Sequence, residues 1–125
     1  MMSATGYPNR AMHDAVARAV AGYLADAGLD GAHPRPWLPR TMSEALGEDA
    51  IDGDVRGIPG AWIGVTSRLK YRPTEELNRA RTGASLLGRD FAIAVQWKGG
   101  APVADALCTI ALSDLAKLLR SSSAP

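Results

Sequence analysis

Residues 52–66 read DGDVRGIPGAWIGVT and join a polar segment to an apolar one. The first part is rich in Gly, Asp and Pro, a composition that is typical of tight turns. The second part, from Trp62 to Thr66, has the β-branched and aromatic composition of a strand. We therefore expect a polar turn that runs directly into a strand.

Upstream of this stretch, we expect a helix and then a long loop. Residues 31–60 are rich in Gly, Pro, Asp and Arg, which predicts a loop with one or two short strands. Before it, apolar side chains recur at helical spacing at Met12, Val16, Val20, Tyr23 and Leu24. Asn9 is the expected N-cap of this helix, and Gly28 is its expected stop.

Downstream, the chain alternates helix and strand. A second helix is expected from Pro73 through about Leu87, with Thr74 as its N-cap and Gly88 at its end. Residues 91–97, FAIAVQW, form a nearly continuous apolar run that predicts a buried strand, and residues 98–100 predict a turn.

The C-terminal part is expected to hold one more strand, at residues 106–111, and a short helix. Ser113 can cap this helix. Leu115, Leu118 and Leu119 should face the core, and Cys108 should be a small buried hydrophobic residue that excludes an intramolecular disulfide.

This order of elements predicts an α/β (α+β) fold, a small mixed β-sheet flanked by helices. The 125 residues, 46% hydrophobic and 22% charged, suit one globular domain at 9–120 between flexible tails at 1–8 and 121–125. Fourteen Lys and Arg against thirteen Asp and Glu give a net charge of +1, so any nucleic-acid binding must use local patches. With no signal peptide and no membrane span in the pattern, we expect a cytoplasmic protein.

The turn at residues 53–57, GDVRG, followed by Pro59-Gly60 and a strand, resembles the central block of a known nuclease family. It is similar to the small Holliday-junction-resolvase-like nucleases of actinobacterial phages, which belong to the PD-(D/E)XK superfamily. The resemblance implies a restriction-endonuclease-like core, a phage-infected or prophage-bearing bacterial host, a homodimer, and metal-dependent cutting of branched DNA with Mg²⁺ or Mn²⁺.

The residues of the family's active site are only partly present. On the register of the resemblance, Asp54 matches the first acid, Gly64 takes the place of the second acid, and Thr66 takes the place of the lysine. Residues that lie two apart on a strand point to the same face, so Gly64 and Thr66 would both face the site. Glycine offers no metal ligand there, and threonine offers no positive charge. Asp54, with Asp52 nearby, would bind a metal weakly.

Migrated groups are one alternative for the lost positions. Glu75 and Glu76, at the start of the second helix, and Lys70, just after the strand, would replace them if they project into the site. The other interpretation is that the two acids stabilise the helix N-terminus and that Lys70 is solvated.

The expected nucleic-acid contacts are basic side chains around the edge of this site, at Arg56, Arg68, Arg72 and Lys98. A dispersed solvated surface is the alternative. His13 and His33 are too isolated to predict a metal cluster, and the three Trp residues at 37, 62 and 97 are expected in the core rather than stacked on bases.

The leading hypothesis is therefore a nuclease-fold nucleic-acid-binding protein that has lost catalysis, a pseudonuclease. One alternative is an active structure-selective endonuclease with migrated ligands and Mg²⁺ or Mn²⁺. The other is an inhibitor or assembly module that binds a protein partner and has no affinity for DNA.

Overall fold

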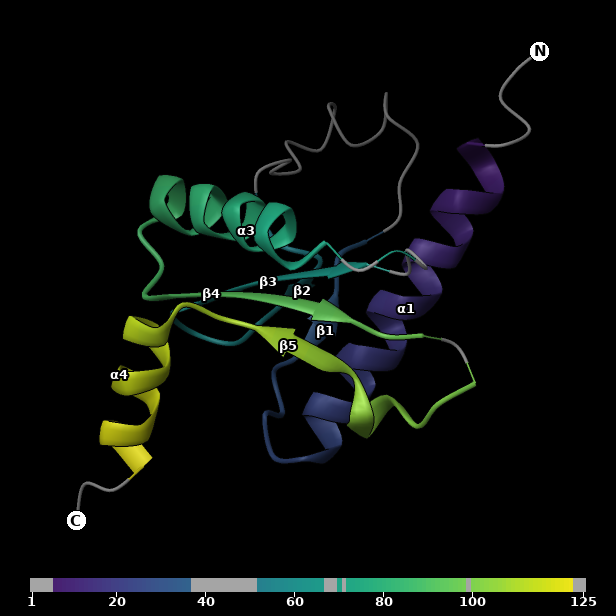
Figure 1. The fold of residues 1–125 in the computed structure, drawn as a ribbon. Helices are drawn as coiled ribbons and strands as arrows, with labels where there is room; N and C mark the ends of the chain where they lie inside the picture. Colours follow the sequence, from purple (N-terminus) through teal and green to yellow (C-terminus); the bar gives the residue numbers. More distant parts are fainter. Residues whose placement is uncertain (1–5, 37–51, 67–69, 71, 99, 123–125) are drawn as a thin grey trace.

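A five-stranded mixed sheet with helices packed on it forms the body of the molecule (Figure 1). The computed structural model describes residues 6–36, 52–66, 70, 72–98 and 100–122. The expected α/β class, a small mixed sheet flanked by helices, is confirmed. None of the helices in the described ranges has the length and apolar character that crossing a membrane requires.

The described elements follow the order that the sequence predicts. They are α1 (Gly6–Asp26), β1 (His33–Pro34), β2 (Val55–Arg56), β3 (Ala61–Thr66), α3 (Pro73–Leu87), β4 (Phe91–Gln96), the 3-10 turn η1 (Val103–Asp105), β5 (Leu107–Thr109) and α4 (Leu112–Ser122). The strands lie in the order β1-β2-β3-β4-β5. The pair β3 and β4 is parallel, with α3 as its crossover, and the other neighbouring pairs are antiparallel.

Strand β3 is buried on both faces, and its alternating side chains belong to two different clusters. Ile63 and Val65 pack with Val16 and Val20 of α1. Trp62, on the other face, packs with Ala80 and Ala84 of α3. The two helices therefore cover opposite faces of the sheet, and every second residue of β3 faces α3.

Two of the expected helix starts are wrong, and both helices carry a proline in or near the first turn. Helix α1 begins at Gly6, so Asn9 lies inside the helix rather than at its cap. Pro8 is tolerated there because the first-turn N–H groups have no acceptor within the helix. In α3, Pro73 takes the first helical position, so the N-cap is Arg72 and Thr74 lies in the first turn.

The expected helix ends are confirmed, because glycine supplies the left-handed backbone that follows a helix. Gly28 has a φ of 113°, and its N–H donates to the Ala25 carbonyl, 3.1 Å away. Gly88 is the C-cap of α3, with a φ of 66°, and its N–H donates to Ser85.

The C-terminal segment departs most from the sequence expectation. Helix α4 begins at Leu112, and the N–H groups of Asp114 and Leu115 both donate to the Ala111 carbonyl, so Ser113 is not the cap. Leu115 and Leu119 do not face the core, because α4 runs away from the sheet and leaves them 38% and 60% exposed.

Cys108 is also not buried as expected. It lies on β5, which pairs only with β4 among the described strands, and a residue on such an edge strand has solvent beside it. Partial desolvation still raises the pKa of its thiol. Strand β5 itself is three residues long, shorter than the expected strand at 106–111.

Candidate functional site

The candidate site is built on Asp54, a buried carboxylate at the start of β2. The residue is 3% exposed, and its backbone is fixed in the sheet because its N–H donates to Ile63 O at 2.8 Å. Its carbonyl accepts a hydrogen bond from the N–H of Arg35, also at 2.8 Å. The side chain is therefore held in one position, facing the end of β3.

Protein groups surround both oxygens of the Asp54 carboxylate. Oδ2 accepts a hydrogen bond from the Val65 N–H at 2.9 Å, and Arg79 Nη2 of α3 lies 3.5 Å from the same atom. Oδ1 lies 3.1 Å from Nε2 of His13, on α1. Three elements, one from each layer of the fold, thus meet at one carboxylate.

The electrostatics follow from these contacts. Burial alone would raise the pKa of Asp54, but the hydrogen bonds from His13 and the Val65 N–H, with the charges of His13 and Arg79, outweigh it and lower that pKa. The ionised carboxylate is therefore the stable form, and it orients the two basic side chains.

Position 64 faces this carboxylate, but it has no room for an acid. A Cβ built on Gly64 would lie 3.7 Å from Asp54 Oδ2 and 2.9 Å from Cζ3 of Trp62. The indole ring of Trp62 also lies against Gly83 of α3, where a Cβ would overlap it. The ring thus occupies the space that a second acid on β3 would need.

A polar cavity of about 330 Å³ lies next to the carboxylate, lined by His13, Val65, Thr66, Glu75, Glu76 and Arg79. The basic side chains of His13 and Arg79 are 40% and 51% exposed, whereas the Asp54 side chain is only 5% exposed. Arg79 also lies over the Trp62 ring, 5.8 Å from its centroid, which adds a cation–π contact. The cavity therefore presents two accessible basic groups above a buried acid.

The three residues considered as migrated groups differ in their relation to the cavity. Glu76 lines the cavity with a side chain that is 14% exposed, and its Oε1 lies 3.8 Å from Arg79 Nη1. Glu75 also borders the cavity, but it is 64% exposed and pairs with Arg72 at 3.4 Å. Lys70 is exposed and does not line the cavity.

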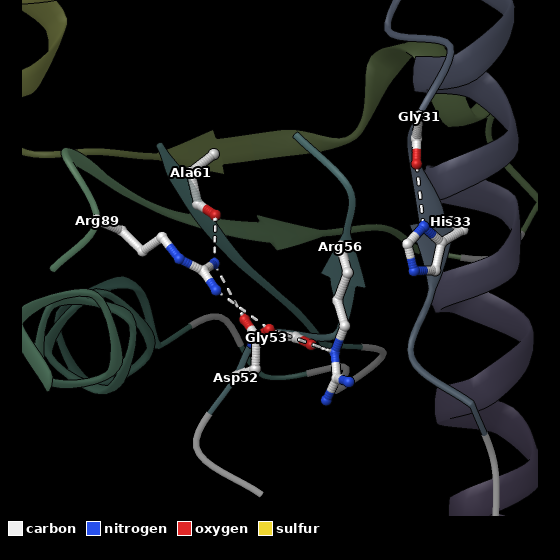
Figure 2. A network of polar contacts seen from close by, with 7 residues as sticks. All are labelled: Gly31, His33, Asp52, Gly53, Arg56, Ala61 and Arg89. Carbon is white, nitrogen blue, oxygen red and sulfur yellow. Dashed lines mark hydrogen bonds and ion pairs between the residues drawn. The ribbon is translucent and has the colours of Figure 1, made fainter. Parts of the chain in front are cut away.

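Asp52 belongs to a different polar network, beside Arg89 and Arg56 (Figure 2). Arg89 donates to both Asp52 oxygens, at 3.1 and 3.2 Å, and to the Ala61 carbonyl at 3.0 Å. Burial would raise the pKa of Asp52, but the hydrogen bonds from Arg89 and the Gly53 N–H, with the charges of Arg89 and Arg56, outweigh burial and lower that pKa. Asp52 therefore fixes the turn before β2 and does not join Asp54.

The basic residues expected at the site edge do not form one group. Arg56 is 14% exposed, donates to Gly53 O at 3.1 Å, and lies 3.7 Å from Asp52 (Figure 2). Arg72 and Lys98 are exposed on separate elements, and Arg68 lies outside the described residues. Among the three described members of this set, Arg72 is the one near the cavity, through its pair with Glu75.

Sequence reasoning missed the two basic residues that contact Asp54. His13 was set aside as isolated, although it precedes Val16 and Val20 by three and seven residues and therefore shares their buried helix face. Arg79 follows Glu76 by three residues on α3, which places both on the cavity side. The sequence signal for His13 is its place as a polar residue on the apolar face of the first helix.

Among the described residues, Trp62, Trp97 and His33 do not line this cavity. Trp62 is core, as expected, at 3% exposure. The indole N–H of Trp97 donates to Ala101 O at 2.8 Å, and Trp37 lies outside the described residues. His33 Nδ1 lies 3.0 Å from the Gly31 carbonyl, on the far side of β2 from Arg89 (Figure 2).

These residues do not fit the divalent metal that the resemblance implies. Hard cations need several unprotonated oxygens, whereas Asp54 is contacted by an N–H, an imidazole and a guanidinium. Glu76 lies near the same guanidinium, and the described residues hold no group of three or more His, Cys, Asp and Glu that could bind a metal. The donor set favours binding of an anion over binding of a cation.

No protein-family model, no curated protein and no solved structure matches this chain.

Proposed function

We propose that this chain is a nuclease-fold protein that binds nucleic acid through the cavity above Asp54 and does not cleave it with a metal. The observation that carries the proposal is the pair of accessible basic groups, His13 and Arg79, held by one buried carboxylate. A carboxylate in this position acts as an orienting group, so that the basic side chains present their remaining N–H groups to the cavity.

The order of elements supports the nuclease-fold part of the proposal. A helix, three strands in antiparallel succession, a crossover helix and a parallel strand follow one another, as the resemblance implies. A Cβ built on Gly64 would lie 3.7 Å from Asp54 Oδ2, so the two positions that the resemblance assigns to the family's acids are close together.

The local chemistry supports binding of phosphate. A guanidinium offers five N–H donors in a planar fork, and Asp54 and Glu76 lie near only some of them. Phosphodiester oxygens can accept the others, together with the imidazole of His13. Because Glu75 and Glu76 border the same cavity, we expect modest affinity that falls with added salt.

The test compares two arginines of α3. Labelled four-way junction and linear duplex are titrated with protein at low salt in EDTA, for wild type, Arg79→Ala and Arg81→Ala. Arg81 is exposed on the same helix and does not line the cavity, so its variant removes the same charge elsewhere. We expect Arg79→Ala to weaken binding about tenfold, the loss of one charged hydrogen bond, and Arg81→Ala to change it less than twofold.

Equal losses in the two variants would show that any binding comes from general charge and would refute the proposed site. Complete absence of binding by the wild-type protein would refute the nucleic-acid proposal itself. It would favour the protein-binding module instead.

The active endonuclease remains a second candidate because Glu76 lines the cavity together with His13 and Arg79, the two basic residues that contact Asp54. It requires Glu76 to leave Arg79 and, together with Asp54, to bind Mg²⁺ or Mn²⁺. Cleavage that appears with Mn²⁺ and is lost in Glu76→Gln would favour this candidate over the pseudonuclease.

A further inference from the structure

Besides its two basic side chains, the cavity above Asp54 contains a carboxylate, Glu76, that phosphate binding does not explain. The Glu76 side chain is 14% exposed, and its Oε1 lies 3.8 Å from Arg79 Nη1. A carboxylate repels a phosphate, so Glu76 weakens simple binding. The same carboxylate can, however, accept a proton from a bound ligand.

One chain of contacts connects Glu76 to His13. The guanidinium of Arg79 lies near Glu76 through Nη1, and its Nη2 lies 3.5 Å from Asp54 Oδ2. The other oxygen of Asp54, Oδ1, lies 3.1 Å from His13 Nε2. Glu76 and His13 therefore stand at the two ends of this chain of contacts, and both line the same cavity as Arg79.

His13 can donate a proton from its second ring nitrogen. Because Nε2 lies against the ionised Asp54 carboxylate, Nε2 carries the proton of that contact, and Nδ1 is the nitrogen that remains. The side chain is 40% exposed and lines the cavity, so the ring is accessible to a bound ligand. The cavity thus combines a proton acceptor, a proton donor and a fixed positive charge.

We infer that this cavity cleaves RNA without a metal, by transferring the phosphorus to the neighbouring 2′-hydroxyl group. Glu76 takes the proton of the 2′-hydroxyl while the 2′-oxygen forms a bond to phosphorus. The bond from phosphorus to the 5′-oxygen breaks, and that oxygen takes a proton from His13 Nδ1. The products are a 2′,3′-cyclic phosphate and a 5′-hydroxyl, and proton exchange with water restores both side chains.

Arg79 is placed to stabilise the negative charge that grows on the non-bridging oxygens during this step. The attacking and leaving oxygens lie roughly in line, on opposite sides of phosphorus. A base and an acid at opposite ends of one chain of contacts suit this geometry.

The substrate class follows from the source of the nucleophile. RNA supplies its own 2′-hydroxyl, which DNA lacks. Cleavage of DNA would need an activated water, and the donor set around Asp54 does not fit the metal that would activate it. The inference rests on the proposed binding of nucleic acid in this cavity and adds both the substrate and the reaction.

The test uses the full chain in EDTA with a labelled DNA strand that contains a single ribonucleotide. The same strand with deoxyribose or 2′-O-methylribose at that position is the comparison. Wild type should give a 2′,3′-cyclic phosphate product from the ribonucleotide strand alone. Glu76→Gln and His13→Gln should each slow cleavage by about 100-fold or more. The matched control, His33→Gln, changes a histidine outside the cavity and should cleave at the wild-type rate.

A second substrate separates proton donation by His13 from a structural role. With sulfur in place of the bridging 5′-oxygen, the leaving group departs as a thiolate and needs no proton, because a thiol is far more acidic than an alcohol. We expect His13→Gln to cleave this substrate at nearly the wild-type rate and Glu76→Gln to remain slow. Equal slowing of both substrates in His13→Gln would overturn the role of His13 as the acid.

The remaining outcomes distinguish this inference from the binding proposal. Binding of the ribonucleotide strand in EDTA without any cyclic phosphate would overturn the inference and leave the binding proposal intact. Absence of binding would overturn both. Cleavage of the all-deoxyribose strand, or equal cleavage by wild type and Glu76→Gln, would also overturn the inference.

Discussion

The position of the Trp62 indole ring leads to a prediction about two helix glycines, Gly83 and Gly22. Gly83 lies in α3, where an added Cβ would overlap the Trp62 indole and stand 2.7 Å from its Cζ2 atom. Gly22 lies in α1, where an added Cβ would meet nothing within 4 Å. The same substitution, Gly→Ala, therefore has opposite expected effects at the two positions.

The magnitudes follow from two opposing effects. Alanine in a helix interior is more favourable than glycine by about 1 kcal/mol, so Gly22→Ala should raise the free energy of unfolding by that amount. At Gly83 the same gain is opposed by overpacking against a buried ring, which costs about 1–3 kcal/mol and forces Trp62 to move. We expect Gly83→Ala to be less stable than Gly22→Ala by about 2 kcal/mol.

Urea denaturation followed by circular dichroism measures both variants against wild type. If Gly83→Ala were as stable as Gly22→Ala, the Trp62 ring would not fill the space between α3 and β3. The ring would then leave room for an acidic side chain at position 64.

Three further predictions concern the polar network and the turns. Because the pKa of Asp54 is lowered in the folded state from 3.8, the ionised carboxylate stabilises the fold above about pH 4, and this stabilisation is lost as the pH falls. Urea denaturation at pH 7 and pH 3 should therefore show a smaller acid-induced loss of unfolding free energy in Asp54→Asn than in wild type. Arg89→Met removes the hydrogen bonds to Asp52 and to Ala61 O, and should lower the unfolding free energy by about 2–3 kcal/mol; a change under 0.5 kcal/mol would show that this network does not stabilise the fold. Gly57→Ala should cost at least about 2 kcal/mol, because Gly57 has a φ of 89° and a Cβ there would overlap the carbonyl of Gly31; a thermal melt within 2 °C of wild type would contradict this.

The sequence predicts the central elements well because their patterns are local. Strand β3 is predicted by the composition of residues 62–66, and the end of α3 by Gly88, whose left-handed backbone only glycine adopts without strain. The starts of α1 and α3 are less predictable, since proline in a first turn competes with any nearby capping side chain.

The candidate site is only partly predictable because it depends on tertiary contacts. Asp54 is found from its turn, but its contacts with His13 and Arg79 join residues 41 and 25 positions away in sequence. The same holds for Asp52, whose partner Arg89 lies 37 residues away. The exposure of Leu115 and Leu119 on α4 is also not predictable from their spacing, because an amphipathic helix has the same sequence pattern whether or not its apolar face packs on its own sheet.

We propose that the Asp54 cavity binds nucleic acid without a catalytic metal. The most direct measurement follows a labelled four-way junction with wild-type protein at low salt, in Mn²⁺ and in EDTA, and records both binding and products. We expect binding in EDTA and no cleavage products in Mn²⁺ at any protein concentration. Cleavage that requires Mn²⁺ and disappears in Asp54→Asn would contradict it, because the carboxylate would then be a metal ligand rather than the partner of His13 and Arg79.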